Sequence, residues 1–86
     1  MKLRKELVCR EIAGEAFLIP LGKTVYDTNG LFALTEVGAF LWKLLPQAPD
    51  EEALLRAVMD EYDVDEATAS ADIAAFLQKL RDLQIL

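Results

Sequence analysis

The side chains of this sequence that could do chemistry are carboxylates and a single thiol. The 86 residues include 15 Asp and Glu, one cysteine, Cys9, and no histidine. Without histidine there is no base for Ser/His/Asp or Cys/His catalysis, and no imidazole ligand for a metal. The carboxylates are scattered over helix-like faces, and no glycine-rich phosphate loop appears. The sequence therefore predicts no catalytic residue, no metal site, no cofactor and no enzyme activity.

Composition limits the other classes of function. A lone Cys9 excludes an internal disulfide, and in an apolar strand it is predicted to be a small core residue. No apolar run approaches the ~20 residues of a membrane span, and the N-terminus is charged, so we expect a cytoplasmic protein. The net charge of −6 disfavours nucleic acid, because Lys and Arg contacts to phosphates supply most of such affinity.

The stretch 30–45, GLFALTEVGAFLWKLL, organises the predicted fold. A short apolar strand, Leu31–Leu34, runs directly into Thr35, which is a good helix N-cap. The helix that follows is expected to end at Pro46. Its apolar face is made by residues at helical spacing, namely Val37, Phe40, Leu41, Leu44 and Leu45. Trp42 lies at the margin of that face, where we expect a half-buried side chain that packs and does not contact a ligand.

Two further strands are predicted before this stretch. Residues 7–13 and 16–21 are β-prone, and Gly14-Glu15 between them offers a hairpin turn. Pro20 lacks an amide and is expected near the end of its strand. The third strand would then lie at the edge of an antiparallel meander. The basic residues Lys2, Arg4 and Lys5 are predicted to form a solvated tail.

Two helices are predicted after it. Asp50 is expected to cap a helix that ends near Asp63, and Asp65 to cap a longer one that ends near Leu83. The core stripe of the longer helix is Ala69, Ile73, Phe76, Leu77 and Leu80. One flank of that stripe carries Asp72, Phe76, Lys79 and Leu83, so Phe76 belongs to both.

The order of elements predicts a single α+β domain over residues 1–86, with a three-stranded antiparallel sheet followed by three helices. This order is similar to a winged helix-turn-helix, so a DNA-binding regulator is one alternative. Residues 50–66 carry eight acids and a single base, Arg56, which a duplex would repel. A general protein-interaction domain is another alternative.

The sequence resembles the PqqD-like family, also called recognition elements of ribosomally made, modified peptides. The resemblance rests on the order of apolar segments, namely 17–20 (FLIP), 30–42 (GLFALTEVGAFLW), 54–62, 72–77 (DIAAFL) with Leu80, and Ile85-Leu86. Two positions depart from the family pattern. Thr35 stands where the family usually has Asn, and both residues cap helices. Gln84 stands where the family commonly has Gly, so we expect a slightly different C-terminal turn.

The resemblance implies a binding module without chemistry of its own. Family members hold the leader of a precursor peptide and present the rest to a modifying enzyme, frequently a radical S-adenosylmethionine protein. The leader adds as a strand to the third strand and packs on the third helix. In this sequence that site comprises Leu31, Phe32, Ala33, Leu34, Asp72, Phe76, Lys79 and Leu83. We expect Phe32 and Leu34 to point into the core, and an exposed edge of this kind can also pair with a second copy.

Overall fold

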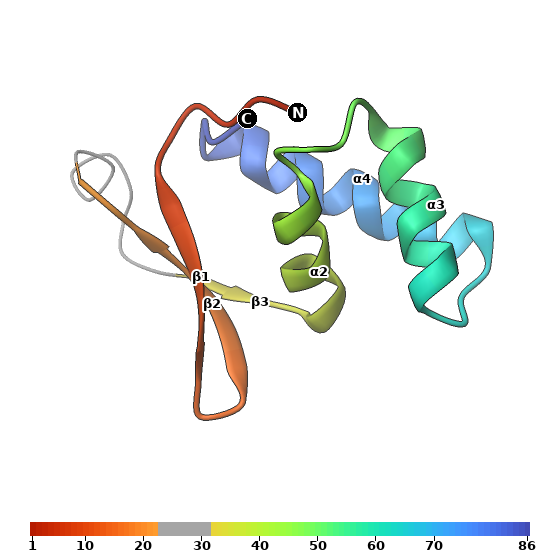
Figure 1. Cartoon of the computed structure of the whole chain (residues 1–86), viewed down its shortest axis with the longest axis horizontal. Coiled ribbons are helices and arrows are strands. Elements are labelled where there is room, and N and C mark those ends of the chain that lie inside the picture. The colour runs from red at the N-terminus through yellow and green to blue at the C-terminus, as the bar shows by residue number, and fades with distance from the viewer. Residues whose placement is uncertain (23–31) are drawn as a thin grey trace.

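The computed structural model describes residues 1–22 and 32–86 and places three strands before three helices (Figure 1). The strands are β1 (Leu7–Ile12), β2 (Glu15–Pro20) and β3 (Phe32–Leu34), and the helices are α2 (Glu36–Leu44), α3 (Glu51–Glu61) and α4 (Glu66–Asp82). The antiparallel sheet has the order β1-β2-β3, which leaves β3 at an edge. The predicted α+β class and the meander are therefore confirmed.

The β1–β2 hairpin turns one residue earlier than predicted. Ile12 pairs with Glu15, so the two loop residues are Ala13 and Gly14 and not Gly14 and Glu15. Their φ angles are +53° and +83°. Two positive φ angles are typical of the type I′ turn, whose twist matches that of the flanking strands. The strand twist thus decides the position of the turn, although Ala13 is strained there.

Each helix begins at the predicted cap. The Gly38 amide donates to Thr35 Oγ1 at 3.0 Å, the Ala53 amide to Asp50 Oδ1 at 3.0 Å, and the Thr68 amide to Asp65 Oδ1 at 2.7 Å. The hydrogen bonds from the amide and then the hydroxyl of Thr68 hold the pKa of the Asp65 carboxyl below its ordinary value. These caps satisfy amides that a helix cannot pair internally.

All the layers meet in one core. Leu18 of β2, Leu41 of α2, Leu54 of α3 and Leu77 of α4 are all 0% exposed. Trp42 is more deeply buried than expected, with 8% of its surface exposed, and it packs among these residues. The helix stripe on α4 is buried as predicted, except at one position. Phe76 is only half-buried, so it does not belong to the core proper.

The prediction that Lys2, Arg4 and Lys5 lie in a solvated tail is confirmed for the exposed side chains of Lys2 and Arg4 but is wrong for Lys5. The Met1 amino group donates to the carbonyls of Leu45 and Ala48, just beyond α2. Lys5 Nζ donates to the Leu83 carbonyl at 2.9 Å, at the end of α4. A cation at the C-terminal end of a helix pairs with exposed carbonyls and with the negative end of the helix dipole. The segment thus closes two helix ends.

The C-terminal turn shows why glycine suits the position that Gln84 occupies in this chain. The Gln84 amide donates to the Arg81 carbonyl at 2.9 Å, and the Ile85 amide donates to the Leu80 carbonyl at 2.8 Å. This pair of bonds is the Schellman ending of a helix, and the apolar contact that accompanies it joins two fully buried side chains, Leu80 and Ile85. The motif places Gln84 at φ +60°, a region that favours glycine.

We predict that Gln84→Gly stabilises the domain by about 0.5–1 kcal/mol, because glycine adopts this φ without a Cβ clash. The melting temperature should rise by roughly 2–8 °C for a domain of this size. Gln84→Ala is the matched control and should not raise it. A melting temperature for the glycine variant at or below that of the alanine variant would contradict this account.

Candidate functional site

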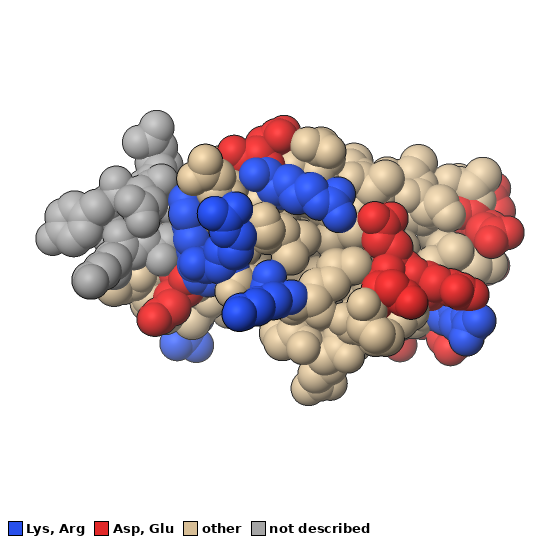
Figure 2. Space-filling view, turned by 90° about the horizontal axis from the view of Figure 1, so that it is seen from above, with Lys and Arg blue, Asp and Glu red and all other residues tan. Residues whose placement is uncertain are grey.

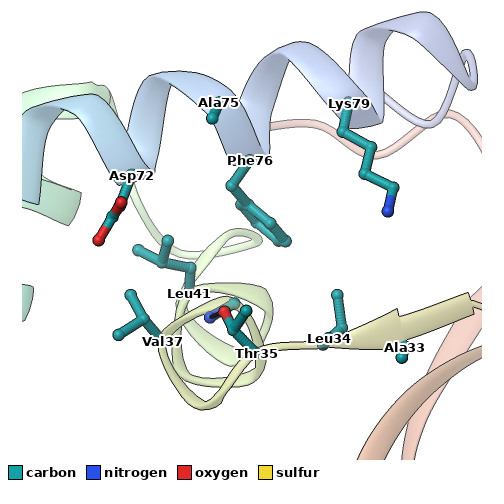
Figure 3. Close-up of a pocket in the computed structure, with 10 residues that line it drawn as sticks. Ala33, Leu34, Thr35, Val37, Leu41, Asp72, Ala75, Phe76 and Lys79 are labelled. Atoms are coloured by element: carbon teal, nitrogen blue, oxygen red, sulfur yellow. Dashed lines mark hydrogen bonds between the residues drawn. The ribbon is translucent and has the colours of Figure 1, made fainter.

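A groove runs between the edge strand and the last helix. It has a volume of about 360 Å³ and lies between β3, the start of α2 and the middle of α4 (Figure 3). The residues that line it are Ala33, Leu34, Thr35, Val37, Gly38, Leu41, Asp72, Ala75, Phe76 and Lys79. Its wall and floor are mostly apolar, with one acid and one base on α4.

The structure brings together most of the residues proposed for the site. Ala33, Leu34, Asp72, Phe76 and Lys79 all line the groove. They come from β3 and α4, and the β3 residues of this set are 38 or more positions from the α4 residues in the sequence. Spacing along α4 explains their common face, since positions 72, 76 and 79 are three or four residues apart.

The other three proposed residues are placed differently. Phe32 is half-buried in β3 and does not line the groove itself, but Lys79 Nζ lies 4.9 Å from the centre of its ring. Leu83 is the C-cap of α4, one turn beyond Lys79, and packs half-buried against the core. Leu31 lies outside the described residues.

Side-chain direction divides β3 between core and solvent. Phe32 pairs with Leu18 and Leu34 pairs with Ala16, so these side chains share the inner face of the sheet. Ala33 is exposed and points the other way. The expected inward direction of Phe32 and Leu34 is thus confirmed, since both pack against the core.

The backbone of β3 is the polar part of the site. Among the described residues β3 pairs with β2 alone, so its second edge carries hydrogen-bonding groups without a strand partner. That edge borders the groove. Such an edge is a template for one more strand, and the groove beside it offers apolar surface for alternate side chains of that strand.

Several groove residues were not singled out by the sequence. Val37 was assigned to the core but is half-buried and lines the groove, as does Gly38. A Cβ on Gly38 would meet Thr35 Oγ1 at 3.2 Å and Leu34 Cβ at 3.6 Å, so glycine lets α2 approach the end of β3 closely. The signal for Val37 was its position at the N-terminal end of the apolar stripe of α2, directly after β3 and the Thr35 cap.

A second groove of about 600 Å³ lies beside the first, between the β1–β2 hairpin and α2. Ala33 and Leu34 line both grooves, so both border β3. The apolar lining of the second groove includes Cys9 and Phe40. Its charged residues are Glu11, Glu15, Glu36 and Lys43.

Two properties of the described residues bear on other functions. Within residues 1–22 and 32–86 no group of three or more Cys, Asp or Glu side chains is arranged to hold a metal ion. In the same part of the chain no helix has the length and hydropathy required to cross a membrane.

Comparison with known proteins then identifies the family. Residues 18–86 match the family described as Coenzyme PQQ synthesis protein D (PqqD). The chain belongs to the PqqD family. A solved structure similar to this PqqD family member is that of TbiB1 in complex with the TbiA(beta) leader peptide. Its sequence identity is 31%, its TM-score is 0.74, and the match covers 100% of this chain and 94% of that chain. Curated protein sequences give no match.

We predict that Phe76→Ala separates binding from folding in this PqqD family member. Phe76 is half-buried, so Phe76→Ala should destabilise the domain less than Leu77→Ala. The Leu77 side chain is 0% exposed, and truncation of such a leucine typically costs about 2–5 kcal/mol of stability. Chemical denaturation measures both. In peptide-binding assays the Phe76→Ala protein should remain folded and should bind a client peptide with lower affinity. A Phe76→Ala variant that is as unstable as Leu77→Ala would place Phe76 in the core instead.

Proposed function

We propose that this protein binds the leader of a ribosomally made precursor peptide and presents the rest of that peptide to a modifying enzyme. In this proposal the leader adds as a strand to β3 and its side chains enter the groove below α4. The protein itself carries out no reaction. The modifying enzyme is of a type that the family often serves, such as a radical S-adenosylmethionine protein.

The edge of β3 that no strand covers among the described residues, beside an apolar groove, is the observation that carries the proposal. Strand addition supplies affinity through main-chain hydrogen bonds and selectivity through pockets for alternate side chains. Membership of the PqqD family and the likeness to TbiB1, which was solved with a leader peptide, support a peptide-binding recognition element. The groove residues Ala33, Leu34, Asp72, Phe76 and Lys79 are proposed as its contacts.

The rest of the proposed contact surface extends this groove at one end. Phe32 lies under Lys79, and Leu83 follows Lys79 by one helical turn. We include both in the proposed site. Leu83→Ala then serves to map the end of the groove. It should weaken peptide binding more than it lowers stability if the bound peptide extends that far.

Proline substitution in β3 tests strand addition. Consecutive residues of a strand direct their N–H and C=O groups to opposite sides, and proline removes one N–H. Of Ala33→Pro and Leu34→Pro, we expect one to lower the melting temperature by breaking the ladder to β2. The other should keep the melting temperature near that of its control and weaken peptide binding sharply. Ala33→Gly and Leu34→Ala are the controls for side-chain loss.

Two outcomes would exclude strand addition at this edge. One is that the proline variant that keeps its melting temperature binds the peptide as tightly as its control. The other is an equal loss of stability in both variants, because the two residues would then not alternate between the ladder and the free edge. Thermal melts and peptide titrations on the same samples distinguish these outcomes.

Salt dependence separates a peptide client from DNA. A protein that contacts six to ten phosphates loses about 10³–10⁵ in affinity between 50 and 200 mM salt. Main-chain and apolar contacts to a peptide depend weakly on salt, so we predict only a modest change for a client peptide. Titrations of a labelled peptide and of a labelled duplex at both salt concentrations make the comparison. A steep salt-dependent affinity for the duplex would favour the DNA-binding regulator.

A further inference from the structure

The groove carries opposite charges at its two ends. Asp72 and Lys79 both project from α4 toward β3, with Phe76 between them (Figure 3). The two charged residues are seven positions apart, which corresponds to ~10.5 Å along a helix. Arg56 pairs with Glu52 and Arg81 with Glu51, and both ion pairs lie outside this groove. Asp72 is exposed, and Lys79 rests on the Phe32 ring.

Charged residues beyond the groove add to the difference in charge between its two ends. At the Leu34 end of β3, the second groove brings Glu11, Glu15 and Glu36 close to the strand against one base, Lys43. At the other end, Lys5 donates to the Leu83 carbonyl, so its ammonium group lies at the end of α4 that carries Lys79. Charge is also unevenly distributed on the face shown in Figure 2, where Lys and Arg gather over one half and Asp and Glu lie mainly over the other.

The direction of β3 fixes which end of an added strand meets which charge. β3 runs from Phe32, beneath Lys79, toward Leu34 and Thr35. The sheet is antiparallel throughout its described strands, and a further strand that continues this pattern runs the opposite way. Its N-terminal part therefore lies at the acidic end of the groove and its C-terminal part lies at the basic end.

We infer that the peptide client carries a charge order: a basic residue, then an apolar residue two positions later, then an acidic residue two positions after that. The inference rests on the proposed function. Groove-facing side chains of a strand recur every second residue, about 6.8 Å apart. That spacing sets the base opposite Asp72, the apolar side chain against Phe76 and the acid opposite Lys79. The base and the acid on the strand are farther apart than Asp72 and Lys79 on the helix, and the long side chain of Lys79 covers this difference.

A displayed library of random 12-residue peptides, selected on the full chain, tests this order. The selected peptides should be enriched in base-x-apolar-x-acid patterns. A synthetic copy of the strongest binder should bind about tenfold tighter than a copy with the base and acid exchanged. This estimate follows because each exposed ion pair shifts affinity by about two- to fivefold, and the exchange turns two attractions into repulsions.

A double variant supplies the control within the protein. Asp72→Lys with Lys79→Asp leaves the net charge unchanged and should invert the preference between the two synthetic peptides. The matched control exchanges Glu52 and Arg56, an exposed ion pair on α3 outside the groove, as Glu52→Arg with Arg56→Glu. This control should leave the preference as it is in the original protein.

The outcomes separate this inference from the function beneath it. Selected peptides without a charge order, or with the opposite order, would overturn the inference and leave peptide binding intact. An order that persists unchanged in the Asp72 and Lys79 double variant would also overturn it. If no peptide is enriched over a selection without protein, both the charge order and the proposed function fail.

Discussion

The edge of β3 that no described strand covers is the constraint on which the rest of this structure depends. A strand of three residues has few ladder bonds of its own, and within residues 1–22 and 32–86 it pairs with β2 on one side only. Three other features hold it in place. Phe32 and Leu34 pack against the core, and Thr35 caps α2 directly after the strand. Gly38 then lets the helix approach closely. An edge fixed in this way is ordered before any partner arrives, so binding a strand costs less conformational entropy.

The two chain ends complete this scaffold at a distance from the edge. The Arg4 amide donates to the Ile85 carbonyl at 2.7 Å, and the first residues close the ends of α2 and α4. A domain of this size buries only about 60–65% of its unfolded surface, so contacts between its termini are a substantial part of its stability. They also fix the helix that forms the wall of the groove, and a shift of α4 relative to β3 would change the width of that groove. The width of the groove therefore depends on residues that do not line it.

Most of this fold and part of the site can be predicted from the sequence. Caps, strand order and the core stripe of α4 follow from local patterns, because each depends on residues within one or two turns of one another. The errors occur where distant residues decide. The role of Lys5 depends on a carbonyl 78 positions away, and the deep burial of Trp42 depends on layers from the whole chain. The turn at Ala13 is the exception, because it is set locally by the pairing of Ile12 with Glu15. Phe76 belongs to both the core stripe and the groove flank in the helical pattern, and only the position of β3 assigns it to the groove. The proposed contacts themselves came from a family resemblance, since apolar spacing alone does not distinguish a groove from a core.

A strand edge beside exposed apolar surface favours self-association. Features at the same edge, which is the proposed peptide-binding site, limit this self-association. Short edge strands and nearby charges discourage edge-to-edge pairing, because a second copy gains few hydrogen bonds and must accommodate the charges. Two copies of β3 paired antiparallel are related by a two-fold axis, so each would bring its own α4 toward the other's. The groove that receives a slender peptide would then have to accommodate a helix. A single extended chain meets the same edge without that steric conflict. The proximity of α4 therefore favours a peptide over a second copy, and this preference comes from shape before any side chain of the client is considered.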